Sequence, residues 1–443
     1  MTENVEPAST GSGPGASRLS DTNYRPPLVQ AVPLGIQHVL AMFAGNVTVP
    51  IIIAGIAGLA GADKVFLIQA AMMVAGVATL FQTIGFGPVG ARLPIVQGTS
   101  FAFIPAMIPI VKGAGLGALF GATLVGGIFH FLLGTFIGRI RGILPPLVTG
   151  IVVLAIGLSL IPVGIKYAAG GAHMPPDFGA LHHWGLALLV MAVILGVKFL
   201  SRGFASAAAI LAGLVVGYLV AIPMGLVDFA RVGEAAWFAL PEFAKYGLEF
   251  EMTAILAMCL MSVVSAIETV GDISGITKGG ANREATDKEL AGGTYADGLG
   301  TAFGGLFGAM PNTSYSQNVG LVALTGMMSR HVVTIGALFL ILAGLVPKVG
   351  AVISVMPNAV LGGAAIVMFG MIAGTGLKLL SDVVMNRRNM VIIAMSLGIG
   401  LGLKSVPEAV AGLPGSVSVL LTSGLLPAAA VAILLNLILP KEG

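Results

Sequence analysis

Two stretches of the sequence decide the fold: PPLVTGIVVLAIGLSLIPVGIK, residues 145–166, and PNAVLGGAAIVMFGMIAGTGLK, residues 357–378. They align at an offset of 212 residues, which pairs Pro145 with Pro357. Two shorter matches follow the same order at nearly the same offset: GALF at 117–120 and 336–339, and LAM at 40–42 and 256–258. The matches predict a duplication of about seven membrane spans. Because seven is odd, the second copy must be inverted in the membrane, as in many secondary transporters.

The composition indicates an integral membrane protein. Of the 443 residues, 56% are hydrophobic and only 9% are charged, and the mean hydropathy is +1.00. Soluble domains carry about 25% charged residues. Apolar runs of roughly twenty residues recur along the whole chain and favour helices over a β-barrel, whose segments would alternate. The one cysteine, Cys259, lies in such a run, so no disulfide framework is expected.

We predict an all-α integral membrane protein with fourteen transmembrane segments arranged as 7+7 inverted repeats. The segments are 33–58, 66–86, 97–111, 115–137, 145–163, 183–199, 205–222, 252–270, 294–308, 317–326, 331–347, 353–376, 389–403 and 416–439. The third and tenth are short and contain polar residues, Gly or Pro. They are predicted to form short strands and half-helices whose ends point into the protein centre.

The charges predict the topology. Most Lys and Arg residues fall on the side that holds both termini, so the termini are expected to be cytoplasmic and the protein to be multi-pass in the cell membrane. The acidic segment 226–251 then lies outside. Residues 1–30 are rich in Ser, Gly, Pro and Thr and are predicted to be a disordered cytoplasmic tail.

The stretch SVVSAIETVGDISG, residues 262–275, carries two acids four residues apart, Glu268 and Asp272. At this spacing they share one face of a helix. A carboxylate within the membrane is costly and marks a functional site by default. The alternative for Asp272 is a position at the cytoplasmic end of the helix, and for Asp297 a helix cap.

Further polar residues in the corresponding and broken segments extend this set. They are His38, Gln97, Ser100, Gln317 and Asn318, with Phe101 and Phe103 as possible aromatic faces. Acids, amides and hydroxyls at fixed places suit a flat ligand with several N–H and C=O groups. No paired ligand spacing or nucleophile motif is visible, so we expect no metal site, no cofactor and no enzymatic activity. Nothing in the chain indicates binding to nucleic acid.

Three motifs carry a resemblance to a known family. QNVGLVALTG (317–326) resembles the signature of the nucleobase–ascorbate transporter family, in which Gln317, Asn318, Gly320, Thr325 and Gly326 occupy the fixed positions. QHVLAMFAGNVTVP (37–50) is similar to its first-span Gln-His motif, and SAIETVGD (265–272) to its eighth-span Glu-x-x-x-Asp. The likeness runs in order from about residue 30 to 440.

The resemblance implies a division into two domains and a mode of transport. Spans 1–4 and 8–11 (31–140 and 252–348) would form a core domain, and spans 5–7 and 12–14 (141–225 and 349–443) a gate domain. Members are proton or sodium symporters and are typically homodimers. H⁺ is the expected coupling ion, and Na⁺ stays open as an alternative.

The resemblance also assigns roles to residues. Glu268 and Gln317 would bind a base through their side chains, and Phe101 and Ser316 through backbone groups, with the Phe101 ring stacking on the base. A proton-linked network would consist of Asp272, His38, Asn318 and Asp297.

The substrate expected is a purine. Uracil members of the family carry His where this chain has Asp272, and Glu where it has Gln317. Ser100 is small and polar and would leave room for an 8-oxo group, so urate and xanthine both fit. The alternatives are uracil or an anion on the same fold, a membrane-embedded enzyme that uses Glu268 and Asp272 as a dyad, and a channel.

Overall fold

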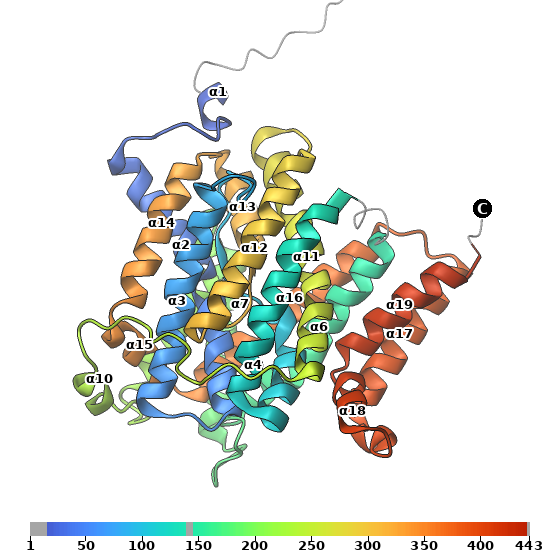
Figure 1. The fold of residues 1–443 in the computed structure, drawn as a ribbon. Helices are drawn as coiled ribbons and strands as arrows, with labels where there is room; N and C mark the ends of the chain where they lie inside the picture. Colours follow the sequence, from blue (N-terminus) through green and yellow to red (C-terminus); the bar gives the residue numbers. More distant parts are fainter. Residues whose placement is uncertain (1–15, 139–144, 441–443) are drawn as a thin grey trace, which may run out of the picture.

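The computed structural model describes residues 16–138 and 145–440, and this part of the chain is mostly helical, with one two-stranded sheet (Figure 1). The first half comprises α1 (Ala16–Leu19), α2 (Leu28–Ile56), α3 (Gly61–Thr83), β1 (Gln97–Thr99), η1 (Phe101–Phe103), α4 (Ile104–Leu133), η2 (Gly134–Phe136), α6 (Pro146–Ala168), α7 (Leu181–Leu200), α8 (Phe204–Ala207), α9 (Ala209–Ala221) and α10 (Ala230–Glu234). The second half comprises α11 (Met252–Ala281), α12 (Asp287–Phe307), β2 (Asn312–Ser314), α13 (Ser316–Thr325), α14 (Arg330–Gly344), α15 (Pro347–Ser354), α16 (Asn358–Ser381), α17 (Arg387–Ser405), η3 (Pro407–Val410), α18 (Gly415–Thr422) and α19 (Leu425–Ile438).

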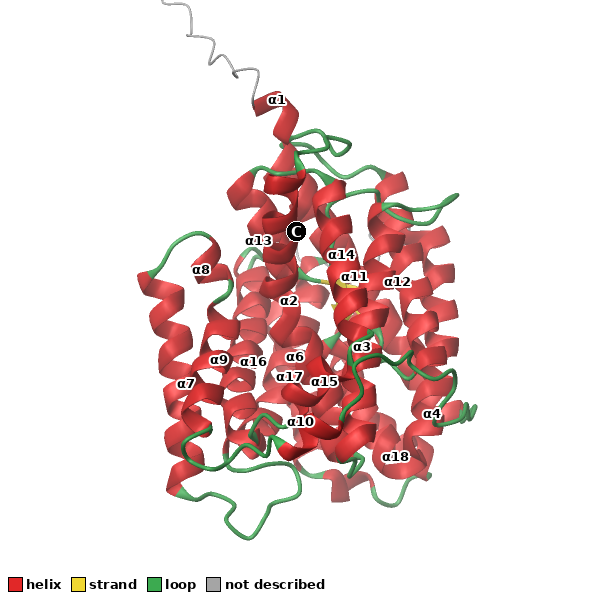
Figure 2. Cartoon of the chain, turned by 90° about the vertical axis from the view of Figure 1, so that its left-hand side faces the viewer, coloured by secondary structure: helices red, strands yellow, loops and turns green. Residues whose placement is uncertain are grey.

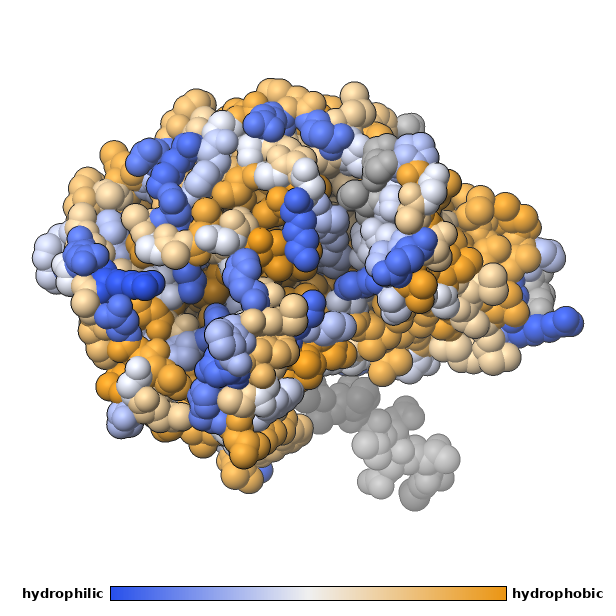
Figure 3. All heavy atoms as spheres, turned by 90° about the horizontal axis from the view of Figure 1, so that it is seen from below, coloured by the Kyte–Doolittle hydropathy of each residue, from blue (hydrophilic) through white to orange (hydrophobic). Residues whose placement is uncertain are grey.

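Seven of these described helices are long and apolar enough to cross a membrane, and α14 with α15, bent by 80°, would make an eighth crossing. The helices α9 and α19 are apolar but shorter. Figure 2 shows the long helices running between an end that carries α1 and an opposite end near which α10 and α18 lie. Seen from that opposite end, hydrophilic side chains are scattered over the face between hydrophobic ones (Figure 3). The chain is therefore a multi-pass membrane protein.

The helices α6 and α16, which contain the two aligned stretches, pack along each other. A Cβ on Gly150 would lie 2.8 Å from the side chain of Leu380, and one on Gly362 would overlap the backbone of Ala168. Gly150 and Gly362 hold the same place in the two aligned stretches, and Ala168 and Leu380, two residues beyond the stretches, are related by the same offset of 212. The two contacts, Gly150 with Leu380 and Gly362 with Ala168, are therefore equivalent under the alignment. Glycines allow the two backbones to approach closely where any side chain would hold them apart.

Other helices pack around α4 and α3. The helix α4 lies against α11 and α12, and α3 lies against α2 and α14. Glycines again mark the closest approach, because a Cβ on Gly305 of α12 would lie 2.6 Å from the backbone nitrogen of Leu124 in α4. The helices α17, α18 and α19 stand together at one side of the molecule, where α17 and α19 contact α6 (Figure 1).

The strands β1 and β2 pair antiparallel in the interior of the protein, with Gln97 opposite Ser314 and Thr99 opposite Asn312. We refer to this two-stranded region as the crossing. All residues of both strands are buried. A helical segment follows each strand almost at once: η1 and α4 after β1, and the ten-residue helix α13 after β2. The N-terminal ends of both segments therefore lie near the crossing, as the sequence predicts for its third and tenth spans.

The predicted boundary between the spans 97–111 and 115–137 coincides with a break inside α4 at Gly115, whose non-helical backbone (φ 83°) separates two helical parts. The structure differs from the predicted segments in two places. The predicted span 252–270 continues to Ala281, so Asp272 lies inside a helix and not at its end. The last predicted span, 416–439, breaks at Gly424, whose φ of 81° separates α18 from α19.

The N-terminal segment also differs from the prediction. Residues 1–15 lie outside the described residues, but α1 and the stretch after it are placed against the chain around Ser329. The backbone N–H of Met328 donates to Leu19 O at 2.8 Å, and that of Arg330 donates to Thr22 O at 3.0 Å. The helix α2 already begins at Leu28. The segment 16–30 is thus ordered by backbone hydrogen bonds, which composition alone does not reveal.

Candidate functional site

The helix α11 supplies two of the acids of the candidate site. Its first N–H groups are capped by Glu251, which accepts from Thr253 N and Ala254 N, and it ends at Asn282 in the left-handed conformation (φ 50°). Desolvation raises the pKa of Glu251, but the hydrogen bonds from Ala254 and Thr253 hold it below its usual range. Between these ends, Glu268 and Asp272 project from one face toward β2 and the start of α13.

Asp272 is held by two serines. The Ser314 hydroxyl donates to Oδ2 at 2.7 Å and the Ser316 hydroxyl to Oδ1 at 2.8 Å. Ser314 ends β2 and Ser316 begins α13, so Asp272 links α11 to the crossing. It is 7% exposed.

Glu268 is only loosely held. Its Oε2 accepts from the Thr313 hydroxyl at 3.5 Å, a long hydrogen bond. The side chain is half-buried and lines a cavity. Of the two acids on α11, Asp272 is thus anchored within the protein and Glu268 is free to meet a ligand.

Asp297, on α12, is fully buried and is the third acid. Its Oδ1 accepts from Gln82 Nε2 at 2.9 Å and also from the Gln97 amide, and its Oδ2 accepts from the Thr269 hydroxyl. These donors come from α3, β1 and α11. Asp297 therefore joins four elements of the protein at the centre of the fold, rather than capping a helix.

His38 and Asn318 form a second junction. The Asn318 amide nitrogen donates to His38 Nδ1, and Asn318 Oδ1 accepts from the backbone N–H of Val96 at 3.1 Å. Both side chains are buried. This contact ties α2 to α13 and to the residue that precedes β1.

Several polar residues at the crossing were not predicted as part of the site. Asn46 Oδ1 accepts from Thr99 N at 2.9 Å, and the Tyr315 hydroxyl donates to Thr99 O at 2.8 Å. Gln82, Thr269 and Ser314 likewise hold the acids described above. The signal that could have revealed Gln82 is an amide in an otherwise apolar span, which is unusual in a membrane segment.

A cavity of about 780 Å³ lies beside the crossing. Glu268, Phe101, Ser316 and Gln317 line it, together with apolar residues of α6 and α16. The Phe101 ring contacts Phe369 of α16 edge-to-face, with centroids 5.6 Å apart. The volume lies within the range of pockets for small organic molecules, about 300–1,000 Å³.

The cavity extends to the surface at one end. Lys198, Ser201 and Arg202, at the end of α7 and just after it, line it there, and the side chains of Lys198 and Arg202 are exposed. This end of the cavity is therefore open and basic, whereas the acids lie at its inner end.

The predicted residues divide into two groups. Glu268, Gln317, Phe101 and Ser316 line the cavity, while the remaining predicted residues lie behind it in the hydrogen-bonded crossing: Ser100, Asp272, Asp297, His38 and Asn318. Ser100 is buried, and its hydroxyl accepts from Ala102 N at 3.3 Å, which caps η1. Phe103 is also buried, in the hydrophobic core away from the cavity lining.

An apolar cavity with a carboxylate, an amide, an aromatic ring and two half-helix ends can bind a small planar polar molecule. Among the described residues, no ion pair neutralises Glu268, Asp272 or Asp297. The cluster thus has the capacity to hold a proton or to meet hydrogen-bond donors. These features are typical of a membrane transport protein.

Comparison with solved structures identifies the fold. The transmembrane domain of the cyanobacterial bicarbonate transporter BicA superposes with a TM-score of 0.58 over 90% of this chain and 98% of that one, at 17% identity. At this identity the likeness shows a common fold and nothing about the substrate.

Sequence comparison identifies the family. The profile of the permease family matches residues 29–409. The uric acid permease PucK of Bacillus subtilis is 40% identical and covers 92% of this chain and 95% of its own length. The xanthine permease XanQ of Escherichia coli is 34% identical, with coverages of 96% and 94%. The chain belongs to this permease family, the nucleobase–ascorbate transporters, which confirms the resemblance read from the three motifs.

Proposed function

We propose that the protein imports purine bases, urate or xanthine or both, by proton symport. The observation that carries this proposal is the cavity in which Glu268, Gln317 and Phe101 meet. The named substrates of the two relatives, uric acid and xanthine, are flat molecules with several N–H and C=O groups. They match the donors and acceptors of this set.

The base would lie against the Phe101 ring and bind at both edges. Glu268 accepts two ligand N–H groups, and charge-assisted bonds of this kind are stronger than neutral ones. Gln317 offers a donor and an acceptor. The first N–H groups of α13, beginning at Ser316, lack intrahelical acceptors and can donate to a ligand carbonyl. The hydroxyl of Ser100 does not contact the base in this proposal and supports the site indirectly, by capping η1.

Proton coupling is assigned to the acids behind the cavity. Glu268 and Asp272 lie one turn apart with no cation beside them, and two unpaired negative charges at this distance in a low dielectric repel strongly. One of the two therefore stays protonated until the network rearranges, so that the proton and the substrate are bound and carried together. We assign the proton to Asp272, with His38, Asn318 and Asp297 as its network. Na⁺ is the alternative coupling ion.

Transport would proceed by alternating access between a core domain and a gate domain. The proposed core contains the crossing, α2–α4 and α11–α14, and the proposed gate contains α6, α7, α9, α16, α17 and α19. The cavity lies between the two sets, since it is lined by α11 and α13 from one and by α6 and α16 from the other. A sliding of the gate against the core would close the basic end and open the other.

The two equivalent contacts between α6 and α16 support the proposed inverted repeat, and the short helices complete the proposed fourteen spans. If both termini are cytoplasmic, the open end at Lys198 and Arg202 faces the cytoplasm and the structure is inward-open. These two cations would attract purine anions. A homodimer in the cell membrane completes the proposal.

The alternative substrates are less favoured by the site. The Glu268 carboxylate would repel a small inorganic anion, and the two cations among the described lining residues, Lys198 and Arg202, lie at the open end of the cavity. Uracil stays possible on the same fold, but the relatives named for uric acid and xanthine argue for a purine.

The test is uptake of radiolabelled urate and xanthine by cells that lack their own permeases. The proposal predicts accumulation that an uncoupler abolishes and that replacing sodium by choline leaves unchanged. Unlabelled purines should compete and unlabelled uracil should not. Accumulation that depends on sodium would show that Na⁺, and not H⁺, is the coupling ion. Competition by uracil alone would overturn the purine assignment.

A further inference from the structure

The connection between α6 and α7 holds a cluster of side chains at the start of α7, whereas the open end of the cavity lies at the other end of this helix, at Lys198. Its backbone is fixed by hydrogen bonds at both ends: Gly179 N donates to Ala169 O at 2.7 Å, and Ala180 N donates to Asp177 O at 3.0 Å. The Asn358 amide, in the first turn of α16, donates to Gly170 O at 2.9 Å. The loop is thus joined to the ends of α6 and α16, two of the helices that line the cavity.

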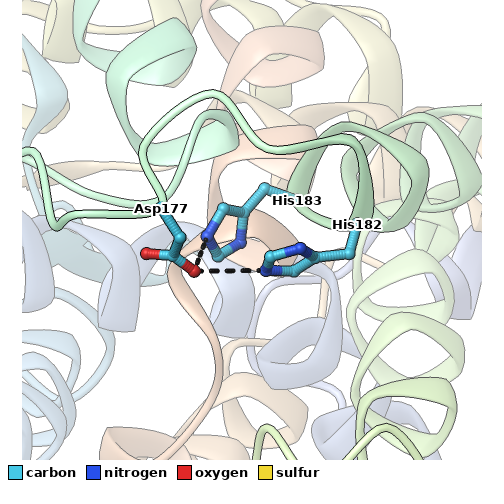
Figure 4. A group of neighbouring side chains, drawn as sticks. All are labelled: Asp177, His182 and His183. Atoms are coloured by element: carbon cyan, nitrogen blue, oxygen red, sulfur yellow. Dashed lines mark hydrogen bonds and ion pairs between the residues drawn. The ribbon is translucent and has the colours of Figure 1, made fainter.

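Two imidazoles converge on one carboxylate oxygen in this loop (Figure 4). His183 Nε2 lies 2.9 Å and His182 Nε2 lies 3.2 Å from Oδ2 of Asp177. The two ring centroids are 4.0 Å apart. The three potential ligand atoms all lie within 4.8 Å of one another.

These separations suit a transition metal ion. Zn²⁺ binds imidazole nitrogen and carboxylate oxygen at about 2.0–2.2 Å, so the ligand atoms of a tetrahedral site lie roughly 3.3 Å apart. The two nitrogen–oxygen separations are close to this value, and a small rotation of each side chain would aim all three atoms at one point. Two imidazoles select Zn²⁺, Co²⁺, Ni²⁺ or Cu²⁺ over Mg²⁺ and Ca²⁺, which prefer oxygen.

We propose that Asp177, His182 and His183 form a binding site for one divalent transition metal ion, with water completing its coordination. The Asp177 carboxylate supplies a negative charge that offsets the charge of the ion. The side chains of Asp177 and His182 are 51% and 39% exposed, so an ion can enter from solvent, whereas His183 is 13% exposed and fixes the inner side of the site. We predicted no metal site from the sequence because Asp177, His182 and His183 lie outside the polar segments around Glu268.

A bound ion would link the loop to the first turn of α7. The loop already contacts α16 through Asn358, so the ion would stiffen the ends of three helices of the proposed gate. The site is independent of the proposed substrate and its chemistry.

The experiment measures binding of Zn²⁺ and Co²⁺ to the purified full-length chain. Isothermal titration with Zn²⁺ should show one site, and Co²⁺ should give visible absorption bands of a tetrahedral or five-coordinate complex. His182→Ala, His183→Ala and Asp177→Asn should each weaken binding at least tenfold, because even the loss of a residue that only supports a ligand typically costs ten- to hundredfold. His173→Ala, which removes an exposed histidine of the same loop outside the cluster, is the matched control and should bind as the parent does.

Gel filtration and thermal unfolding of each variant show that the fold is intact. The double variant His182→Ala/His183→Ala should lose both the Zn²⁺ site and the Co²⁺ spectrum. Zn²⁺ binding that persists in that double variant, or that is lost equally in His173→Ala, would overturn the proposal. Absence of any Co²⁺ spectrum in the parent would do so too.

Discussion

Two buried interfaces join the two halves of the chain. One is the contact between α6 and α16, which we call the seam, and the other is the crossing of β1 with β2. Different forces hold them together. In the seam, glycines such as Gly362 bring apolar backbones together, and shape decides the fit. At the crossing, buried acids and amides such as Asp297 and Gln97 are joined by hydrogen bonds. Close packing of the two backbones fixes the seam, whereas the direction of the hydrogen bonds fixes the crossing. The proposed gate is thus held by shape, and the proposed binding element by polar contacts.

The strongest test of the crossing is Asp272→Asn. An asparagine keeps the size of the side chain, and the hydroxyls of Ser314 and Ser316 can each donate or accept, so the local structure should survive. The amide mimics a permanently protonated acid. Purine binding should stay within about threefold of the parent, a difference of ~0.6 kcal/mol, while uncoupler-sensitive accumulation is lost.

Filter binding and uptake measured on the same membranes would separate these two effects. If binding and accumulation fall together, Asp272 belongs to the substrate site or the scaffold. If accumulation equals that of the parent, the proton resides elsewhere, and Asp297 is the next acid to test.

Asp297→Ala should destabilise the crossing itself. Three donors, from Gln82, Gln97 and Thr269, converge on the two carboxylate oxygens, and an alanine removes both acceptors. An unpaired buried donor costs ~1–3 kcal/mol. The melting temperature in detergent should therefore fall, while Asp382→Ala, at an exposed acid after α16, should leave it unchanged. Equal melting temperatures for both variants would contradict the assigned hydrogen bonds.

Gly362→Ala should break the seam. The added methyl group overlaps the backbone of Ala168 and Tyr167, and overpacking of this kind costs ~1–3 kcal/mol. Gly370→Ala, on the same helix, is the matched control because no atom lies within 4 Å of the Cβ position there. A lower melting temperature for the first variant alone is expected. The description of the seam fails if both variants melt together.

The smallest expected effect is that of Gln317→Glu. A second carboxylate beside Glu268 removes one donor and repels anionic purines. The loss of one hydrogen bond, ~0.5–1.5 kcal/mol, corresponds to a two- to tenfold weaker affinity. Competition curves for urate and xanthine should shift accordingly. An unchanged competition profile would place Gln317 outside the base-binding site.

Much of the site could be predicted from the sequence because its residues lie in motifs. Glu268 and Gln317 were found through their spacing and their resemblance to a family, and the structure brings both to one cavity. The partners of Asp272 and Asp297 could not be predicted in the same way. Ser314 and Thr269 are ordinary polar residues in the sequence, and only the fold shows that their hydroxyls meet carboxylates from other elements.

The limits of the helices show a similar contrast. Hydropathy located the apolar runs, but it ended α11 too early at the first acids, since burial by α12 and α13 lets the helix continue to Ala281. Hydropathy also missed the break at Gly424, which depends on a positive φ. Hydropathy responds to residue type and not to tertiary contacts, and this accounts for both errors.

The most direct test of the account is the affinity of purified protein for xanthine or urate, measured for the parent, Glu268→Gln and Glu408→Gln. Glu408 is an exposed acid of η3 and serves as the control. The account predicts that Glu268→Gln weakens binding roughly ten- to hundredfold, because a buried ligand donor left unpaired costs ~1–3 kcal/mol, and that Glu408→Gln binds as the parent does. Parental affinity in Glu268→Gln would contradict the assignment of this carboxylate, and with it the proposed site.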